Sequence, residues 1–398
     1  MYKLSGKIQH YTWGGFKFIP DLLGVSNLQN EPYAEYWMGA HPASPSMIDT
    51  GEGDSVRLDQ WIANDPEKIL GKGSYDEFGS LPFLFKVLDV KDMLSIQVHP
   101  NKDEALKGFI LENEKGIPVQ ASHRNYKDQN HKPEVAVALG DFWLLHGFKP
   151  QKELVKTLEN IEEFNFLLPV FKNEGYYGLY KKVMEFSSEE TDKILAPLMK
   201  KISAEYEKGR LSKADPAYWA GKAVSNLKEF KNLDRGIFSI YFFNLLHLKK
   251  GEAIFQGAGV PHAYLEGQNI ELMSNSDNVL RGGLTTKHID VKELMKHILF
   301  EGVDPFILKG EQNGSEYIYK CPVPDFVVSR IKIKNGTSYN HRAGSAEICI
   351  VLSGEVVFYN GNKKLAVQKG GAVFIEFGEN YSIETETQSE IYKAGVPE

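Results

Sequence analysis

The amino-acid sequence predicts a mainly β protein with an α-helical insertion. Short apolar runs of strand length, separated by glycine- and asparagine-rich turns, recur on both sides of residues 150–234. Within that segment β-branched runs vanish, and Leu195, Leu198, Met199 and Ile202 recur at helical spacing. The change in periodicity therefore marks an insertion of helices into a β fold.

Composition excludes several classes of protein. A chain of 398 residues with 42% hydrophobic and 25% charged residues is typical of a globular protein of about two or three domains. A net charge of -7 argues against a nucleic-acid or anionic-membrane partner, although a small anionic substrate remains compatible with it. Cys321 and Cys349 are too few for a disulfide framework, residues 1–20 show no signal peptide, and no apolar run reaches membrane-spanning length. We expect a cytoplasmic protein.

Three strands and a brief helix are expected in the first 100 residues. Residues 33–39 and 82–89 have strand character, and residues 65–70 form the helix. The turn at residues 90–92 leads into a third strand, Leu94–Pro100, so we expect the second and third strands to pair as an antiparallel hairpin.

Strand character returns at residues 131–139 and again after the insertion. Strands are expected at residues 237–248 and 253–256, followed by one amphipathic helix at residues 290–300. From residue 304 onward, short strands punctuated by glycine and asparagine turns predict a second, smaller β-sandwich or barrel.

The strand Leu94–Pro100 carries an unusual row of polar side chains. Because side chains alternate along a strand, Ser95, Gln97 and His99 share one face, and the opposite face is apolar. A half-exposed strand with a polar outer face explains this pattern simply. The alternative is a Gln-x-His pair that begins a metal site, for which other segments would have to supply the remaining ligands.

Glu134 stands at the head of an apolar strand. Pro133 fits the first residues of a strand, so Glu134 leads Val135–Val137 into a sheet. A carboxylate there is costly to bury unless it is paired or bound to a metal. Lys132 projects on the same side two residues earlier, so a salt bridge is the alternative to metal binding.

A third polar cluster follows the insertion. In residues 251–264 a strand between glycines leads to a glycine-rich turn and a Pro-His pair, which is the second-motif pattern of cupin barrels. Such a turn delivers His262 to the barrel interior. Together with Gln97, His99 and Glu134 it would supply two nitrogen and two oxygen ligands, a set that suits Zn²⁺.

Two cations end this part of the chain. Arg281 and Lys287 follow a loop rich in polar side chains, and nearby glycines allow a ligand to approach closely. A planar guanidinium and an ammonium group are suited to clamping a phosphate or an enediolate. A solvated loop with ordinary surface cations is the alternative.

With these residues in hand, the chain resembles type I mannose-6-phosphate isomerases of the cupin superfamily over roughly residues 1–300. The resemblance rests on segments that occur in the family's order. They are Trp13-Gly14, Pro32-Tyr33-Ala34-Glu35, Trp37-Met38-Gly39, His41-Pro42, Leu81-Pro82-Phe83-Leu84-Phe85-Lys86, Ser95-Ile96-Gln97-Val98-His99-Pro100, Asn130-His131-Lys132-Pro133-Glu134, Pro261-His262-Ala263-Tyr264 and Ser276-Asp277-Asn278-Val279-Leu280-Arg281.

The resemblance implies a division into three parts and a set of site residues. It implies a cupin (jelly-roll) catalytic domain at residues 1–149 and 235–303, a helical insertion at 150–234 and a jelly-roll-like C-terminal β domain at 304–398. His341 is the only histidine of that last domain, which we expect to be structural and metal-free. The implied roles are one zinc per chain on Gln97, His99, Glu134 and His262, a catalytic Arg281, pocket positions at Lys132, Glu271 and Asp277, and a phosphate-facing side at Ser95 and Lys287.

The implied reaction interconverts mannose 6-phosphate and fructose 6-phosphate through a cis-enediolate. That chemistry needs one base and positive charge beside the developing oxyanion, and redox-silent zinc is adequate for it. Arg281 would stabilise the enediolate, and the base is open among a metal-bound water, Glu271, Asp277 and Lys132.

Two other functions compete with this interpretation. A cupin metal dioxygenase would need a redox metal, and would more often present three histidines and a carboxylate. A non-catalytic sugar-phosphate-binding relative could have lost metal ligands, which this chain retains. The expected partner is a small hexose 6-phosphate, and the chain is expected to be a monomer or a weak homo-oligomer.

Overall fold

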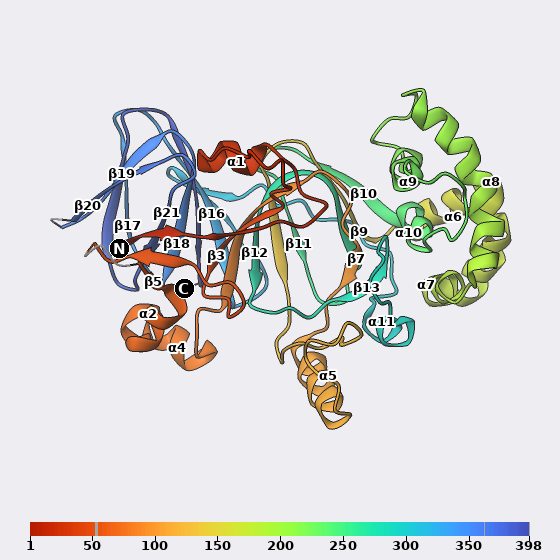
Figure 1. Cartoon of the computed structure of the whole chain (residues 1–398), viewed down its shortest axis with the longest axis horizontal. Helices are drawn as coiled ribbons and strands as arrows, with labels where there is room; N and C mark the ends of the chain where they lie inside the picture. Colours follow the sequence, from red (N-terminus) through yellow and green to blue (C-terminus); the bar gives the residue numbers. More distant parts are fainter. Residues whose placement is uncertain (52–54, 362, 398) are drawn as a thin grey trace.

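The computed structural model describes residues 1–51, 55–361 and 363–397. Figure 1 shows β-strands in the middle and at one end of the molecule, with a group of helices at the other end. The prediction of a mainly β fold with a helical insertion and a second β part is confirmed. Within the described part of the chain, no helix combines the length and apolar character needed to cross a membrane.

The central sheet is assembled around one long strand, β12 (His262–Ser274). Residues 262–266 of β12 pair with β9 and β7, whereas residues 267–274 pair with β6 and β8. The change falls at Gly267, whose φ is 119° and where a Cβ would lie 2.3 Å from the carbonyl oxygen of Asp141. Only glycine fits there. The other strands of this sheet are β2 (Lys7–Gln9), β3 (Glu35–Gly39), β6 (Phe83–Val90), β7 (Ile96–Val98), β8 (Glu134–Ala138), β9 (Phe142–Phe148), β10 (Phe243–Leu248), β11 (Ala253–Gln256) and β13 (Leu280–Gly283).

The expected hairpin between the second and third strands is wrong. β6 pairs with β3 on one edge and with β12 on the other, so neither edge is free for β7. β7 pairs instead with β13 and with the first residue of β12. The turn at residues 90–92 therefore carries the chain from one part of the sheet to another.

The expected strand at residues 237–248 is also partly wrong. Its first part is helix α10 (Gly236–Phe242), every residue of which is buried, and β10 begins only at Phe243. A short helix surrounded by apolar neighbours shows no amphipathic period, so its sequence resembles that of a buried strand.

The inserted helices anchor the back of β7. Ile96 and Val98 are fully buried in one hydrophobic cluster with side chains from the helices, such as Tyr180 and Trp219. Burying a side chain of this size contributes about 1.5–3 kcal/mol, so the strand is held firmly from behind. The helices are α6 (Gln151–Asn160), the 3-10 helix η1 (Glu162–Leu167), α7 (Leu168–Met184), α8 (Ser188–Glu207) and α9 (Pro216–Val224), while α5 (Lys102–Glu114) and α11 (Val291–His297) lie closer to the sheet ends (Figure 1).

The second β part includes strands from both ends of the chain. Its larger sheet has the order β14-β15-β16-β23-β18-β21-β1-β4-β5, so the N-terminal β1 continues a sheet of C-terminal strands. The sequence did not predict that an N-terminal strand joins the C-terminal sheet. The three-part division at the stated boundaries stays a prediction. The strands are β1 (Tyr2–Ser5), β4 (Met47–Asp49), β5 (Ser55–Arg57), β14 (Glu311–Asn313), β15 (Glu316–Tyr319), β16 (Val327–Ile333), β18 (Glu347–Ser353), β21 (Ala372–Ile375) and β23 (Ser389–Gly395).

A smaller sheet, ordered β17-β22-β19-β20, covers the larger one, and short helices lie beside them (Figure 1). These elements are β17 (Ser338–Arg342), β19 (Glu355–Asn360), β20 (Lys363–Gln368), β22 (Asn380–Glu384), α1 (Phe18–Leu23), α2 (Leu58–Asn64), α3 (Pro66–Leu70) and α4 (Lys72–Phe78).

Candidate active site

Three strand ends bring two imidazoles and one carboxylate together. His99 follows β7, Glu134 opens β8 and His262 opens β12. His99 Nε2 lies 3.4 Å from Glu134 Oε1, and His262 Nε2 lies 3.3 Å from Glu134 Oε2. The three side chains are buried and offer ligand atoms within 4.8 Å of one another. They form a group that could hold a metal ion.

Both imidazoles are oriented by backbone carbonyls. His99 Nδ1 donates to the carbonyl of Asn278 at 2.8 Å, and His262 Nδ1 donates to that of Val260 at 2.9 Å. Each ring therefore directs its Nε2 at Glu134. Among the described residues, His99 Nε2 has no hydrogen-bond partner although it is buried. A cation fits this arrangement, because it would satisfy the orphaned nitrogen.

The protonation states also suit a cation. Burial, helped by the charge of Lys132, lowers the pKa of His99 to about 4. Burial alone would raise the pKa of Glu134, but the Lys132 ammonium and the imidazoles hold it well below its ordinary value. At neutral pH His99 is therefore neutral and Glu134 ionised, which are the forms that bind metals.

Lys132 and Gln97 lie beside this cluster. Lys132 Nζ lies 2.7 Å from Glu134 Oε1, so the salt bridge considered for this carboxylate exists beside the imidazoles. Gln97 is the central residue of β7 and stands opposite His262 in the strand register.

A narrow cavity of about 50 Å³ opens on this cluster. Five predicted site residues line it, namely Gln97, Lys132, Glu134, His262 and Glu271. Sequence reasoning missed the other residues that line it, which are Glu35, Lys86, Leu88, Leu94, Ala263 and Tyr264.

The missed residues include a buried ion network. Lys86 Nζ lies 2.8 Å from Glu271 Oε2 and 3.4 Å from Glu35 Oε2, and Trp37 Nε1 donates to Glu35 at 2.5 Å. Burial raises the pKa of Glu271, with the Lys86 ammonium opposing it. Burial works against the charge of Lys86, but the two carboxylates outweigh it and raise its pKa. The feature of the sequence that could have indicated this ion network is a single lysine, Lys86, inside the apolar run of β6.

Replacing Lys86 is expected to destabilise the protein strongly. Lys86→Met would leave Glu271 and Glu35 without their shared cation, and losing one partner of a buried ion pair costs about 3–5 kcal/mol. Urea unfolding should show this loss. The control is Lys72→Met, which removes an exposed pair with Asp76 and should change stability little. Wild-type stability in the Lys86 variant would contradict the expectation.

Arg281 and Lys287 lie outside the residues that line the cavity. Arg281 stands opposite Gln97 in the register of β13 and β7, and its partial burial lowers the pKa of the guanidinium. Partial burial lowers the pKa of Lys287 too, assisted by the charges of Arg281 and Lys127. Arg281, Lys287 and Lys127 therefore lie near enough to influence one another, and Ser95 directly precedes β7.

Asp277 is another predicted site residue that lies outside the lining of the cavity. Its side chain is exposed, and Oδ2 lies 3.6 Å from Nε2 of His41. It is not among the residues that line the cavity in the described part of the chain.

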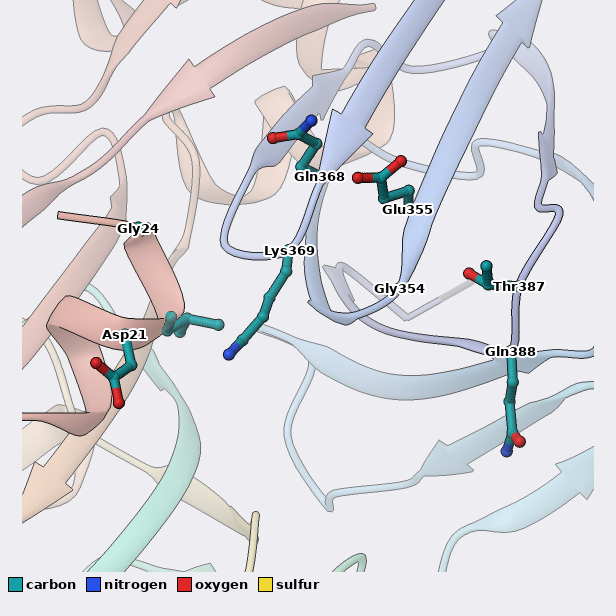
Figure 2. Close-up of a pocket in the computed structure, with 9 residues that line it drawn as sticks. Asp21, Gly24, Gly354, Glu355, Gln368, Lys369, Thr387 and Gln388 are labelled. Carbon is teal, nitrogen blue, oxygen red and sulfur yellow. The ribbon is translucent and has the colours of Figure 1, made fainter.

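A larger pocket of about 600 Å³ lies between α1 and the C-terminal strands. Figure 2 shows Lys369 reaching across it toward α1, with Asp21 and Glu355 from the two sides. Most side chains around it are exposed, and no predicted site residue lines it. Five of the predicted site residues line the smaller cavity instead.

A buried His-Glu-His cluster inside an antiparallel β fold defines a cupin-type metal site. The family model of the phosphomannose isomerase type I catalytic domain matches residues 1–151. Mannose-6-phosphate isomerase of Escherichia coli K12 is 36% identical over 386 residues, which is 96% of each chain. The human enzyme of that name is 34% identical over 416 residues, covering 96% of this chain and 95% of its own.

Solved structures agree over the whole length. Mannose 6-phosphate isomerase from Salmonella typhimurium, bound to its substrate and to zinc, has a TM-score of 0.89 at 33% identity and covers 100% of both chains. A zinc-bound mannose 6-phosphate isomerase also has a TM-score of 0.89 at 33% identity, covering 100% of this chain and 99% of its own. The chain therefore belongs to the type I mannose-6-phosphate isomerase family, and the resemblance and the fold class predicted from the sequence are confirmed.

Proposed function

We propose that this protein is a zinc-dependent isomerase that interconverts mannose 6-phosphate and fructose 6-phosphate. The observation that carries the proposal is the buried cluster of His99, Glu134 and His262 at the end of a polar cavity. Gln97 would supply the fourth ligand, giving two nitrogen and two oxygen atoms. Bound zinc would supply Lewis-acid charge without redox chemistry.

We assign to Glu271 the removal of the carbon-bound proton. The reaction removes the proton from C2 of the open-chain aldose, passes through a cis-enediolate and returns a proton to C1, while the O2 proton moves to O1. Glu271 lines the cavity, and burial raises the pKa of its carboxyl group, which brings a general base closer to neutral pH. Lys86 stays beside it as a fixed positive charge.

Positive charge surrounds the position where the oxyanion develops. Lys132 projects into the cavity as a cation paired with Glu134, and would stabilise negative charge on O1 and O2. Arg281, on β13, is assigned the same role. Lys287 and Ser95 are assigned to bind the phosphate group of the substrate. Asp277, paired with His41, is assigned to hold the loop that precedes Arg281 rather than to move a proton.

The remaining parts of the proposal are those predicted from the sequence. The protein works in the cytoplasm as a monomer or a weak homo-oligomer, and its substrate is a small hexose 6-phosphate. The C-terminal β domain is structural and holds no metal.

Solvent deuterium tests the enediolate route. During conversion of mannose 6-phosphate in D₂O, a carboxyl base should exchange its proton with solvent over repeated turnovers. NMR should then find deuterium at C1 of fructose 6-phosphate and at C2 of mannose 6-phosphate. Complete conversion back and forth with no deuterium at either carbon would contradict a proton held by a base that exchanges with solvent, and would favour hydride transfer between C1 and C2.

A further inference from the structure

We infer that Asn278 is a positioning residue that sets the geometry of the metal cluster and of the cavity together. Asn278 is fully buried, lies between β12 and β13, and is not among the residues that line the cavity. It makes contacts to two segments that carry site residues.

The first contact is to a proposed metal ligand. His99 Nδ1 donates to the backbone carbonyl of Asn278 at 2.8 Å, so the position of that carbonyl decides where His99 Nε2 points. A carbonyl in a loop holds a ring in place only if the loop itself is fixed.

The side chain of Asn278 fixes that loop to residues 127–130. Its Oδ1 accepts from the backbone N–H of Lys127 at 2.7 Å and of Asp128 at 3.2 Å. Its Nδ2 donates to the carbonyls of Asp128 and Asn130, both at 2.8 Å. Every hydrogen-bonding group of the amide is used, so a substitute of similar size cannot reproduce the arrangement.

Residues 127–130 lead directly into the cluster. Lys132 and Glu134 follow Asn130 by two and four residues, and Arg281 follows Asn278 by three. One amide therefore joins the acceptor of His99, the approach to Glu134 and the start of the strand that carries Arg281. Its loss would loosen all three at once, without removing any group that touches zinc or substrate.

Zinc affinity and the kinetics of the zinc-loaded variant together test the inference, which rests on the proposed zinc site. Asn278→Ala should weaken zinc binding, measured by competition with a chelator, by about 10–100-fold, as is usual for residues that support a ligand. In the zinc-saturated variant kcat should fall more than KM changes, because reacting groups are misplaced while the phosphate contacts remain.

Asn27→Ala is the matched control. Asn27 is a half-buried asparagine whose amide likewise joins two stretches of backbone: Nδ2 donates to the carbonyls of Phe16 and Glu31, and Oδ1 accepts from the N–H of Glu31. This variant should melt at a lower temperature yet bind zinc as the wild type does. Equal zinc affinity and kcat in Asn278→Ala and the wild type would overturn the inference.

A milder variant covers the case in which Asn278→Ala does not fold. Ser276 Oγ donates to Asp128 Oδ1 at 2.8 Å, within the same cross-link. Ser276→Ala should weaken zinc binding in the same direction by a smaller factor, and unchanged affinity would again overturn the inference. A wild-type chain that takes up no zinc would instead refute the proposed zinc site itself.

Discussion

Glu134→Gln is expected to abolish zinc binding and isomerase activity and to destabilise the protein. Glu134 is the central group of the cluster, since His99, His262 and Lys132 all contact its carboxylate. The amide has almost the same shape but no negative charge, so it neither neutralises a metal ion nor pairs with Lys132. Losing a contact that supports a metal ligand weakens metal binding by about 10–100-fold. Losing the ligand itself should therefore weaken zinc binding by a larger factor. Metal analysis of the purified variant and an isomerase assay give the result.

The stability change of this variant needs a control. Removing one partner of a buried ion pair costs about 3–5 kcal/mol, and urea unfolding of zinc-free protein should show it for Glu134→Gln. Glu390→Gln removes a similarly buried carboxylate, paired with Arg330 at 2.5 Å and Lys250 at 2.6 Å, in the C-terminal β part. It should lose comparable stability and keep its zinc. Full activity in Glu134→Gln would remove this carboxylate from the site.

Arg281→Ala should reduce kcat by about 10²–10³-fold, the usual effect of removing one group that stabilises a developing oxyanion. Zinc affinity should stay unchanged, because the guanidinium is not part of the buried cluster. Steady-state kinetics on mannose 6-phosphate at saturating zinc measure the first quantity, and chelator competition measures the second.

Two comparisons sharpen the test of Arg281. Arg281→Lys keeps a positive charge without the planar fork and should fall between the wild type and the alanine variant. Lys287→Ala should mainly raise KM, since its proposed contact with the phosphate is present before and during the reaction. An Arg281→Ala enzyme that folds and keeps the wild-type kcat would exclude this arginine from the mechanism.

The cluster itself could be predicted because its ligands lie at strand ends. Alternation along β7 places Gln97 and His99 on the side opposite Ile96 and Val98, whatever the neighbouring strands are. The prediction that Glu134 begins a buried strand needed only Pro133 and the apolar run that follows. The local sequence pattern was sufficient to predict how each of these residues is placed. The family resemblance then indicated that they belong to one site.

Features that depend on strand pairing could not be predicted in this way. Lys86 meets Glu35 and Glu271 only because β6 lies between β3 and β12, and the sequence suggested β7 as its neighbour instead. The joining of β1 to β21 links residues separated by almost the whole chain. Asn278 lay within a recognised motif, but its task becomes visible only when residues 127–130 are beside it.

Removal and return of zinc test the central proposal most directly. Protein treated with a chelator and freed of it by dialysis should lose mannose-6-phosphate isomerase activity in a coupled assay. Adding Zn²⁺ should restore that activity in proportion to bound metal, up to one ion per chain. Undiminished isomerase activity in protein shown by metal analysis to contain no zinc would contradict the account.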